Sequence, residues 1–312
     1  MPVRPPGGDE TMIPSPPVRA PQIGFLYLPP IRVQGYSIAG EETVVQVPEL
    51  DVCFDIGRCP RMALTSRFVA LSHGHMDHAA GLAYYFSQRY FQGMDVGTVI
   101  CHPKLEQPIH SMMRAWVEIE SQRTPYQVRS IEPDQEFELK NNIYLRAFDT
   151  VHTVPSLGYV IVERRSKLRP ELVGLPQQRL VELKDEGQQI TTTQEIPLVA
   201  YTGDTATGPH LDRSDVLGAK VLIIECTFME DGHRGRASVG KHLHLDEVVE
   251  LIDRSEAEAV VLIHLSRRTH IGIAREQLES AVPERLKDRV FLLMDNRSNR
   301  ARYEQQDRDA SE

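Results

Sequence analysis

The chain has 312 residues, 41% of them hydrophobic and 25% charged, which is typical of a globular protein with a sizeable core. The net charge of −9 argues against broad, non-specific nucleic-acid binding, and no apolar run reaches the roughly 18 residues of a transmembrane helix. Because the N-terminus also lacks a signal-peptide pattern and the four cysteines form no CxxC pair, we expect a soluble, cytoplasmic protein without a membrane partner.

Residues 1–22 are rich in proline and glycine, so we expect a flexible leader. Beyond it, short apolar runs bounded by turn residues predict strands, and apolar residues at helical spacing predict helices. The predicted strands are 24–28, 43–47, 51–56, 68–72, 98–102, 143–148, 157–163, 196–204, 220–226, 259–265 and 289–294. The predicted helices are 79–90, 103–121, 243–254 and 274–280.

The order of these elements indicates the fold class. Too many strands precede the first helix for a doubly wound parallel sheet, whereas an α/β fold with two mixed sheets between helices accommodates them. We expect one catalytic domain over residues 23–298, followed by a polar tail at 299–312. Within this domain, the polar stretch 164–195 has the composition of an insertion.

A cluster of polar residues directly follows the apolar run 68–71. It contains His73, His75, Asp77 and His78, at spacings that do not fit one helical face. They do fit a loop that leaves a strand end, where the side chains meet in one pocket. A single histidine would more often be a hydrogen-bonded core residue, but four such groups together predict a metal site, since imidazole and carboxylate are the usual ligands of zinc, manganese and iron.

Three further candidate ligands each follow a predicted apolar strand. His152 lies beyond strand 143–148, Asp204 lies in the TGDT segment, and His264 ends the run VVLIH. Taken alone, His152 fits a surface histidine equally well, and Asp204 fits a turn aspartate better. The whole constellation of seven residues favours metal binding, because rigid strand ends position ligands while leaving the loops open to substrate.

The run SHGHMDH, together with His152, Asp204 and His264, resembles the motifs of the metallo-β-lactamase superfamily of binuclear hydrolases. The resemblance extends over roughly residues 22–295. It implies a four-layer αββα sandwich with the metals at one edge of the two sheets. Thioesterases, lactonases, nucleases and β-lactamases share the loop motif, so it identifies the superfamily and not the reaction.

Three further segments, HTVPSLGY, IIECTF and HLSRR, resemble the ribonuclease Z branch of this superfamily. They correspond to that branch's runs His-x-x-Pro-Ser-x-Gly-Tyr, Glu-Ala-Thr-Phe and His-Phe-Ser-x-Arg, with Cys226 as a departure in the second. The matching residues after His152 are Pro155, Ser156, Gly158, Tyr159, Glu225, Thr227, Phe228, His264, Ser266 and Arg268.

The resemblance implies two divalent metal ions, zinc in the first place, with manganese and iron also suitable. One would be held by His73, His75 and His152, and the other by Asp77, His78 and His264, with Asp204 between them; Asp77 also counts as catalytic. Two such ions activate a water molecule for in-line attack on phosphorus. The implied substrate is an RNA or a small phosphodiester.

The same branch has a histidine about 22 residues before the last ligand, which acts with a carboxylate as proton donor. That distance falls on His242, and Glu225 supplies the carboxylate. Leu243 and His244 replace the branch's Ser/Thr pair, so the choice between His242 and His244 stays open; for His244 we favour a packing role at a helix start. Glu225 also fits a solvated carboxylate at a strand end.

Several polar and basic residues near these positions are candidates for binding the substrate phosphate, although a solvated basic loop would have the same sequence. They are Ser156, Arg234, Arg236, Lys241 and Arg268.

The leading functional hypothesis is therefore a ribonuclease Z-like phosphodiesterase, an endoribonuclease of tRNA 3′ processing. Against pre-tRNA as the substrate stand the acidic charge and the stretch 164–195, which leaves little room for the branch's protruding basic arm. The alternatives are a hydrolase of a thioester, a lactone or a cyclic nucleotide, and, in another class, a non-catalytic metal-stabilised nucleic-acid-binding protein. The sequence leaves both a monomer and a homodimer open.

Overall fold

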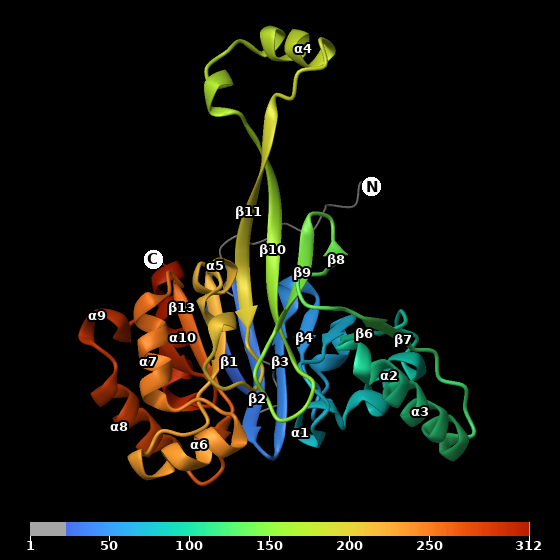
Figure 1. Ribbon diagram of the computed structural model, residues 1–312, viewed down its shortest axis with the longest axis vertical. Helices are drawn as coiled ribbons and strands as arrows, with labels where there is room; N and C mark the ends of the chain where they lie inside the picture. Colours follow the sequence, from blue (N-terminus) through green and yellow to red (C-terminus); the bar gives the residue numbers. More distant parts are fainter. Residues whose placement is uncertain (1–22, 312) are drawn as a thin grey trace, which may run out of the picture.

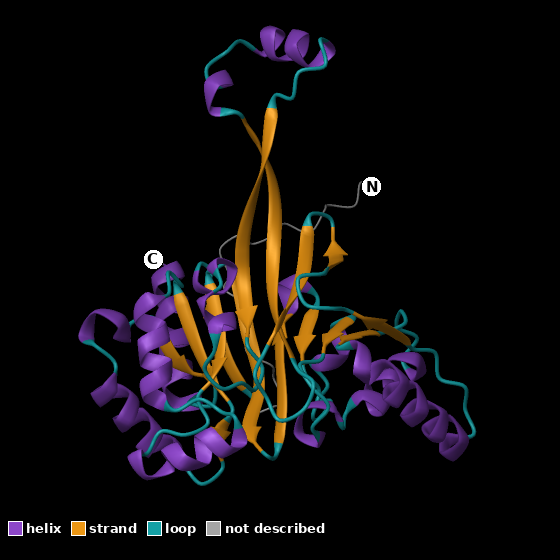
Figure 2. Cartoon of the chain, viewed as in Figure 1, coloured by secondary structure: helices purple, strands orange, loops and turns teal. Residues whose placement is uncertain are grey.

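The computed structural model describes residues 23–311, so the predicted leader 1–22 lies outside the described residues. Two β-sheets pack face to face, and helices cover their outer sides (Figure 2). Within residues 23–311, no helix combines the length and the apolar character needed to cross a membrane.

The first sheet contains the N-terminal strands in chain order, with β14 added beside β2. It runs antiparallel from β1 to β4 and parallel from β4 to β7. Buried residues of α2 and α3 pack against its outer face. Its strands are β1 (Gly24–Leu28), β2 (Ile31–Ala39), β3 (Glu42–Val47), β4 (Val52–Phe54), β5 (Phe68–Ala70), β6 (Thr98–Cys101), β7 (Gln127–Ser130) and β14 (Leu265–Ser266), and its helices are α1 (Met76–Ala79), α2 (Leu82–Phe91) and α3 (Pro103–Glu120).

The second sheet has the order β15-β13-β12-β11-β10-β9-β8. Its strands β11, β12, β13 and β15 are parallel, and both faces of these strands are buried, which explains their continuous apolar runs. The strands are β8 (Glu136–Lys140), β9 (Ile143–Asp149), β10 (Leu157–Leu168), β11 (Thr191–Tyr201), β12 (Val221–Glu225), β13 (Ala259–Ile263) and β15 (Val290–Leu292). The remaining helices of the body are α5 (Ser214–Leu217), α6 (Arg234–Gly240), α7 (Leu245–Arg254), α8 (Ile271–Ala281), α9 (Glu284–Lys287) and α10 (Asn296–Ser311).

The main core lies between the two sheets. Phe54 of the first sheet stacks on Tyr201 of the second with ring centroids 4.6 Å apart, and both rings are fully buried. A second core joins the other face of the second sheet to α7 and α8. The layers are therefore helix, sheet, sheet and helix, which confirms the predicted αββα sandwich.

Strands β10 and β11 form an arm that rises from the body of the protein (Figure 1). They remain paired from Glu163–Ile196 to Leu168–Thr191, beyond the end of β9, and the arm carries α4 (Gln177–Asp185) at its tip. The prediction that 164–195 leaves little room for a protruding arm is therefore wrong. Two extended strands, at about 3.3 Å per residue, span a long distance with few residues.

Residues 299–312, the predicted polar tail, begin inside helix α10, which extends to Ser311. The Tyr303 ring contacts Phe25 edge-on at 5.4 Å between centroids, and Gln306 donates a hydrogen bond to the carbonyl of Tyr27 (3.2 Å). This helix therefore packs on β1. The sequence of α10 is so polar that it has no periodic apolar pattern from which this contact could be predicted.

Strand β2 was not among the predicted strands because polar residues interrupt its apolar pattern. In the structure, Gln34 donates to Gln46 (2.7 Å) and Ser37 bonds Thr43 (3.1 Å), so these side chains pair across the β2–β3 ladder while buried. Such cross-strand pairs satisfy polar groups that a sequence pattern assigns to a loop.

Candidate functional site

The candidate ligands meet at one edge of the sandwich because five strands end there. The loop 71–78 follows β5, and His152, Asp204 and His264 follow β9, β11 and β13. Glu225 is the last residue of β12. The structure thus brings together all seven residues that the sequence singled out as ligands.

His73, His75 and His152 form the first group. The Nδ1 atom of His75 lies 2.9 Å from Nε2 of His73 and 3.2 Å from Nε2 of His152. Two nitrogens bound to one tetrahedral zinc lie about 3.3 Å apart, since each bond is roughly 2.0 to 2.1 Å long. The three imidazoles are therefore spaced as ligands of a single ion.

Asp77, His78 and His264 form the second group. The Nε2 atoms of His78 and His264 are 3.2 Å apart, and Oδ2 of Asp77 lies 3.7 and 3.6 Å from them. Asp77 lies in the first turn of the short helix α1, and its carboxylate also accepts a hydrogen bond from the backbone N–H of Gly40 (2.8 Å). This second group also has its donor atoms facing one another.

Asp204 lies between the two groups. Its Oδ2 atom is 3.8 Å from His73, 3.3 Å from His78 and 3.3 Å from His264, whereas its buried Oδ1 atom has no hydrogen-bond partner. A buried carboxylate oxygen without a partner is costly, and a cation at this point would satisfy it. The donor set and this orphaned oxygen fit divalent metal binding.

The protonation states of the first group suit metal ligation. Burial lowers the pKa of His73 to about 2 and also lowers the pKa values of His75 and His152. These imidazoles are therefore neutral near pH 7 and keep a lone pair for a metal. His78 differs. Burial by itself would lower the pKa of its ring, but the carboxylates of Asp204 and Asp55 hold that pKa well above its usual value.

Two unusual backbone positions shape the site. Gly203 has φ +58°, and a Cβ atom there would lie 2.6 Å from Cβ of Ser72, so glycine is needed for the turn that presents Asp204. His264 also has a left-handed φ of 58°, and its backbone N–H donates to Oγ of Ser37 (2.9 Å). Strained non-glycine residues of this kind cluster at functional sites.

Asp55, which was not predicted as a site residue, organises the candidate ligands from behind. This fully buried carboxylate accepts hydrogen bonds from the backbone N–H (2.6 Å) and hydroxyl (2.8 Å) of Ser72, from Nδ1 of His78 (2.7 Å) and from the hydroxyl of Tyr201 (2.6 Å). The Ser72 hydroxyl in turn lies 2.9 Å from Nδ1 of His73. Asp55 therefore orients His78 directly and His73 through Ser72, as carboxylates do behind metal-binding histidines.

A signal for Asp55 is present in the sequence. It follows the apolar run VCF, the same arrangement of an acidic residue after an apolar strand that marks Asp204. Asp55 falls inside the predicted strand 51–56, whereas β4 ends at Phe54, so the residue lies just beyond the strand end.

The substitution Asp55→Asn is expected to lower metal affinity about 10- to 100-fold, because it removes the charge that orients His78 while keeping the side-chain size. Competition with a coloured chelator measures the affinity, and circular dichroism checks the fold. Tyr201→Phe is the matched control, since it removes a single hydrogen bond to the same carboxylate and should change the affinity much less. Unchanged metal affinity in Asp55→Asn would contradict the orienting role.

Glu225 lies behind His264 on the other side of the site, as Asp55 lies behind His78. Its Oε2 atom accepts from the Thr227 hydroxyl (2.6 Å), which lies 2.9 Å from Nδ1 of His264, and its Oε1 atom accepts from the N–H of Thr205 (2.6 Å). The carboxylate is fully buried, so it is not the solvated strand-end group that the sequence also allowed.

His242 completes this side of the site. Its Nδ1 atom lies 3.1 and 3.2 Å from the two Glu225 oxygens and 4.0 Å from Oδ2 of Asp204. Although burial opposes it, Glu225 raises the pKa of His242 to about 9. The ring stands beside His152 and His264, at centroid distances of 5.2 and 5.3 Å.

His244, the other histidine of this segment, points elsewhere. It is the N-cap of α7, where its Nδ1 atom accepts from the N–H of Asp246 (3.4 Å) and its own N–H donates to Glu247 (2.8 Å). Its Nε2 atom lies 3.2 Å from the carbonyl of Glu230. Both ring nitrogens are thus engaged in local structure, as expected for a residue at a helix start.

The candidate phosphate-binding residues differ in their exposure and in their hydrogen-bond and ion-pair partners. Ser156 is buried and its hydroxyl bonds Thr150 (2.6 Å), and the Lys241 ammonium donates to the carbonyl of His152 (2.9 Å). Arg234 forms an ion pair with Asp246. Arg236 and Arg268 are exposed.

Comparisons with known proteins agree with this fold. Residues 60–169 match the model of the β-lactamase superfamily domain. The chain is similar to tRNase Z TRZ1 of Arabidopsis thaliana, with 34% identity over 264 residues that cover 84% of this chain and 94% of that protein. It is also similar to the chloroplastic tRNase Z TRZ2 of the same plant, with 34% identity over 252 residues, 78% of this chain and 70% of that protein.

Solved structures show the same architecture. The short form of human tRNase Z superposes with a TM-score of 0.55 at 15% identity, covering 86% of this chain and 95% of that one. Zn²⁺-bound PqqB from Methylobacterium extorquens gives a TM-score of 0.55 at 14% identity, with 86% and 96% covered. At these identities the likeness concerns the fold alone. Because a relative that is 34% identical is matched over nearly its whole length, the chain belongs to the tRNase Z family of metal-dependent hydrolases with the metallo-β-lactamase fold.

Proposed function

We propose that this protein is an endoribonuclease that cleaves precursor tRNA at its 3′ side. The observation that carries the proposal is the His242–Glu225 pair, 3.1 Å apart, beside the buried group of metal-type donors. Such a pair suits a reaction whose leaving group needs a proton, as the ribose 3′-oxygen does. The names of the relatives, tRNase Z, support the same substrate.

In this proposal two divalent ions, zinc in the first place, bind in the two groups around Asp204. His73, His75 and His152 would hold one of them and Asp77, His78 and His264 the other, and Asp204, which lies between the two groups, would be a further ligand. When bound, the ions supply an activated water and neutralise charge on the phosphoryl group. Asp55 and Glu225 hold the rings of the proposed ligands in place from behind, and the Asp77 carboxylate is less buried than those of Asp55, Asp204 and Glu225.

His242 is the proposed proton donor. Glu225 occupies the Nδ1 side of the ring, so Nε2 is the nitrogen left for a leaving oxygen. Glu225 favours the protonated imidazole, and it is itself fixed by the Thr205 N–H and the Thr227 hydroxyl. The pair can therefore deliver a proton without rearranging.

For the substrate phosphates we propose Arg236 and Arg268, because both guanidinium groups are exposed. Lys241 acts through His152, whose carbonyl it contacts, and Ser156 shapes the turn through Thr150. Arg234, on the same helix α6 as Arg236, is paired with Asp246.

The arm formed by β10 and β11 removes one objection to a tRNA substrate, since the chain does carry a protruding element. Its stretch 164–195 has six Arg or Lys against five Asp or Glu, so it is not strongly basic. Four of the six cations, Arg164, Arg165, Lys167 and Arg169, lie on its outgoing side. The part of the proposal that depends on the arm is that RNA contacts the paired strands β10 and β11.

A homodimer stays a prediction from the sequence. The outer faces of α2 and α3 expose the large apolar side chains of Tyr84, Phe91, Trp116 and Ile119, and the Ser87 hydroxyl of α2 bonds Glu120 of α3 (3.1 Å). Exposed aromatic residues of this kind are enriched in protein interfaces. If two copies associate, we propose this face as the contact.

The test is the cleavage of precursor tRNA beside bis(p-nitrophenyl) phosphate, a thioester and a lactone, with metal content measured on the same preparation. We expect cleavage of both phosphodiesters, about two metal ions per chain, and loss of activity on chelation with recovery on adding zinc. Hydrolysis of the thioester or lactone without cleavage of either phosphodiester would contradict the proposal and identify another branch of the superfamily's chemistry.

A further inference from the structure

A second cavity lies at the edge of the sandwich opposite the ligand cluster. It has a volume of about 420 Å³. Its lining includes Val221 and Ala259, the first residues of β12 and β13, whereas Glu225 ends β12 at the metal-type site. Four residue steps of about 3.3 Å separate the two ends of β12, so the cavity and the hydrolytic site do not overlap.

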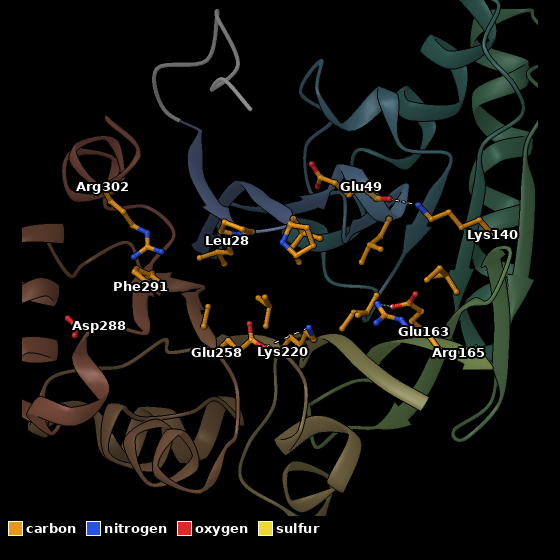
Figure 3. A pocket seen from close by; sticks show the side chains of 18 residues that line it. Leu28, Glu49, Lys140, Glu163, Arg165, Lys220, Glu258, Asp288, Phe291 and Arg302 are labelled. Atoms are coloured by element: carbon orange, nitrogen blue, oxygen red, sulfur yellow. Dashed lines mark hydrogen bonds and ion pairs between the residues drawn. The ribbon is translucent and has the colours of Figure 1, made fainter. Parts of the chain in front are cut away.

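The floor of this cavity is apolar and comes from both sheets. Leu28 and Ile31 flank the Pro29–Pro30 turn of the first sheet, and Leu198 of β11 and Phe291 of β15 belong to the second sheet. Figure 3 shows Leu28 and Phe291 among the side chains that line the cavity. Drug-sized ligands bind in cavities of roughly this size that have apolar walls and a few well-placed polar groups. The open end of the sandwich thus has the volume and the wall chemistry of a small-molecule site.

Most charged groups on the rim are already engaged. Glu163 pairs with Arg165 (2.6 Å), and Lys220 with Glu258 (3.8 Å). The ammonium group of Lys140 donates to the carbonyl of Glu49. The two ion pairs balance their own charges, and the Lys140 ammonium has a backbone acceptor.

Arg302 is the exception. Its guanidinium carbon lies 4.4 Å from the centre of the Phe291 ring, and its buried Nε atom has no hydrogen-bond partner (Figure 3). Asp288 also lines the cavity, but among the described residues no carboxylate reaches ion-pair distance from Arg302. Burial lowers the pKa of this guanidinium, as expected where solvent is partly excluded and no acceptor replaces it.

We propose that this cavity binds a small carboxylate with an apolar body, such as a medium-chain fatty acid. The carboxylate would accept from the terminal guanidinium N–H groups of Arg302, and the apolar body would lie on the floor between Leu28, Leu198 and Phe291. A charge-assisted hydrogen bond of this kind is stronger than a neutral one. The planar guanidinium, already held against an aromatic face, is preorganised for it.

The test uses octanoate as the probe and 1-octanol as its uncharged counterpart, titrated into the full-length protein in a calorimeter. We expect saturable octanoate binding and at least tenfold weaker binding of 1-octanol. Arg302→Met, which keeps a stem against Phe291, should weaken octanoate about tenfold or more and leave 1-octanol unchanged. Phosphodiester hydrolysis should be the same in both proteins.

Two further variants fix the location. Arg300→Met is the matched control, since this arginine lies on the same helix, is exposed and pairs with Glu304, and it should bind octanoate like the unchanged protein. Leu198→Trp fills the cavity and should abolish binding of both probes. The proposal is overturned if octanoate does not bind at millimolar concentration, if Arg302→Met binds it equally well, or if Leu198→Trp leaves binding intact.

Discussion

Replacing Asp204 by alanine is expected to abolish hydrolysis and to remove bound metal. Its carboxylate lies within 3.8 Å of ring nitrogens from both ligand groups, and its Oδ1 atom has no other partner. Loss of one well-placed electrostatic partner already costs roughly 10² to 10³ in kcat, and here the same change also unbalances both metal sites, so we expect a loss of about 10³ or more. Elemental analysis and phosphodiester assays on one preparation measure the two effects.

The matched control for this change is Asp212→Ala. Asp212 lies a short distance along the chain, is exposed and pairs with Arg254, so its removal should leave metal content and activity unchanged. Circular dichroism on both variants separates loss of metal from loss of fold. A folded Asp204→Ala protein that kept two metal ions and full activity would show that the ligand assignment is wrong.

His242→Ala is expected to slow cleavage of an RNA phosphodiester by roughly 10² to 10⁴, the usual contribution of a general acid. The ribose 3′-oxygen needs a proton to leave, whereas p-nitrophenolate does not. The same variant should therefore hydrolyse bis(p-nitrophenyl) phosphate at a rate much closer to that of the unchanged protein. Metal content should not change, because His242 bonds Glu225 and stands outside the seven proposed ligands.

His244→Ala is the control variant for His242→Ala. As the N-cap of α7, His244 should affect stability by about 0.5 to 2 kcal/mol and should not distinguish the two substrates. An equal loss on both substrates in His242→Ala would instead assign this residue a structural or ligand role. If His244→Ala alone showed the selective loss, the proton donor would be the other histidine of the segment.

Much of the candidate site could be predicted from the sequence because each ligand has a local signature. His73, His75, Asp77 and His78 share one short loop, and the three distant ligands each follow an apolar strand. Parallel strands that end together bring such residues to one edge, so recognising the strands was enough to group them. The layered α/β fold followed from the same pattern of strands before the first helix.

Other features depend on contacts that no local pattern contains. Asp55 is a single acidic residue in the sequence, and it joins several groups only because Ser72, His78 and Tyr201 meet it from a loop, a helix and a strand. The choice of His242 over His244 is similar, because left-handed Lys241 turns the chain so that one ring meets Glu225 while the other caps a helix.

The candidate ligands, the sandwich and the family resemblance could be inferred from the sequence alone, since they rest on residue types next to apolar strands. Tertiary structure alone decided that residues 164–195 rise as an arm, that the polar C-terminal residues pack as α10 on β1, and that Arg302 faces an apolar cavity. The physical reason is the same in each case. Pairing of two extended strands, or docking of a polar helix through a few side chains, gains its free energy from distant partners and leaves no periodic apolar pattern along the chain.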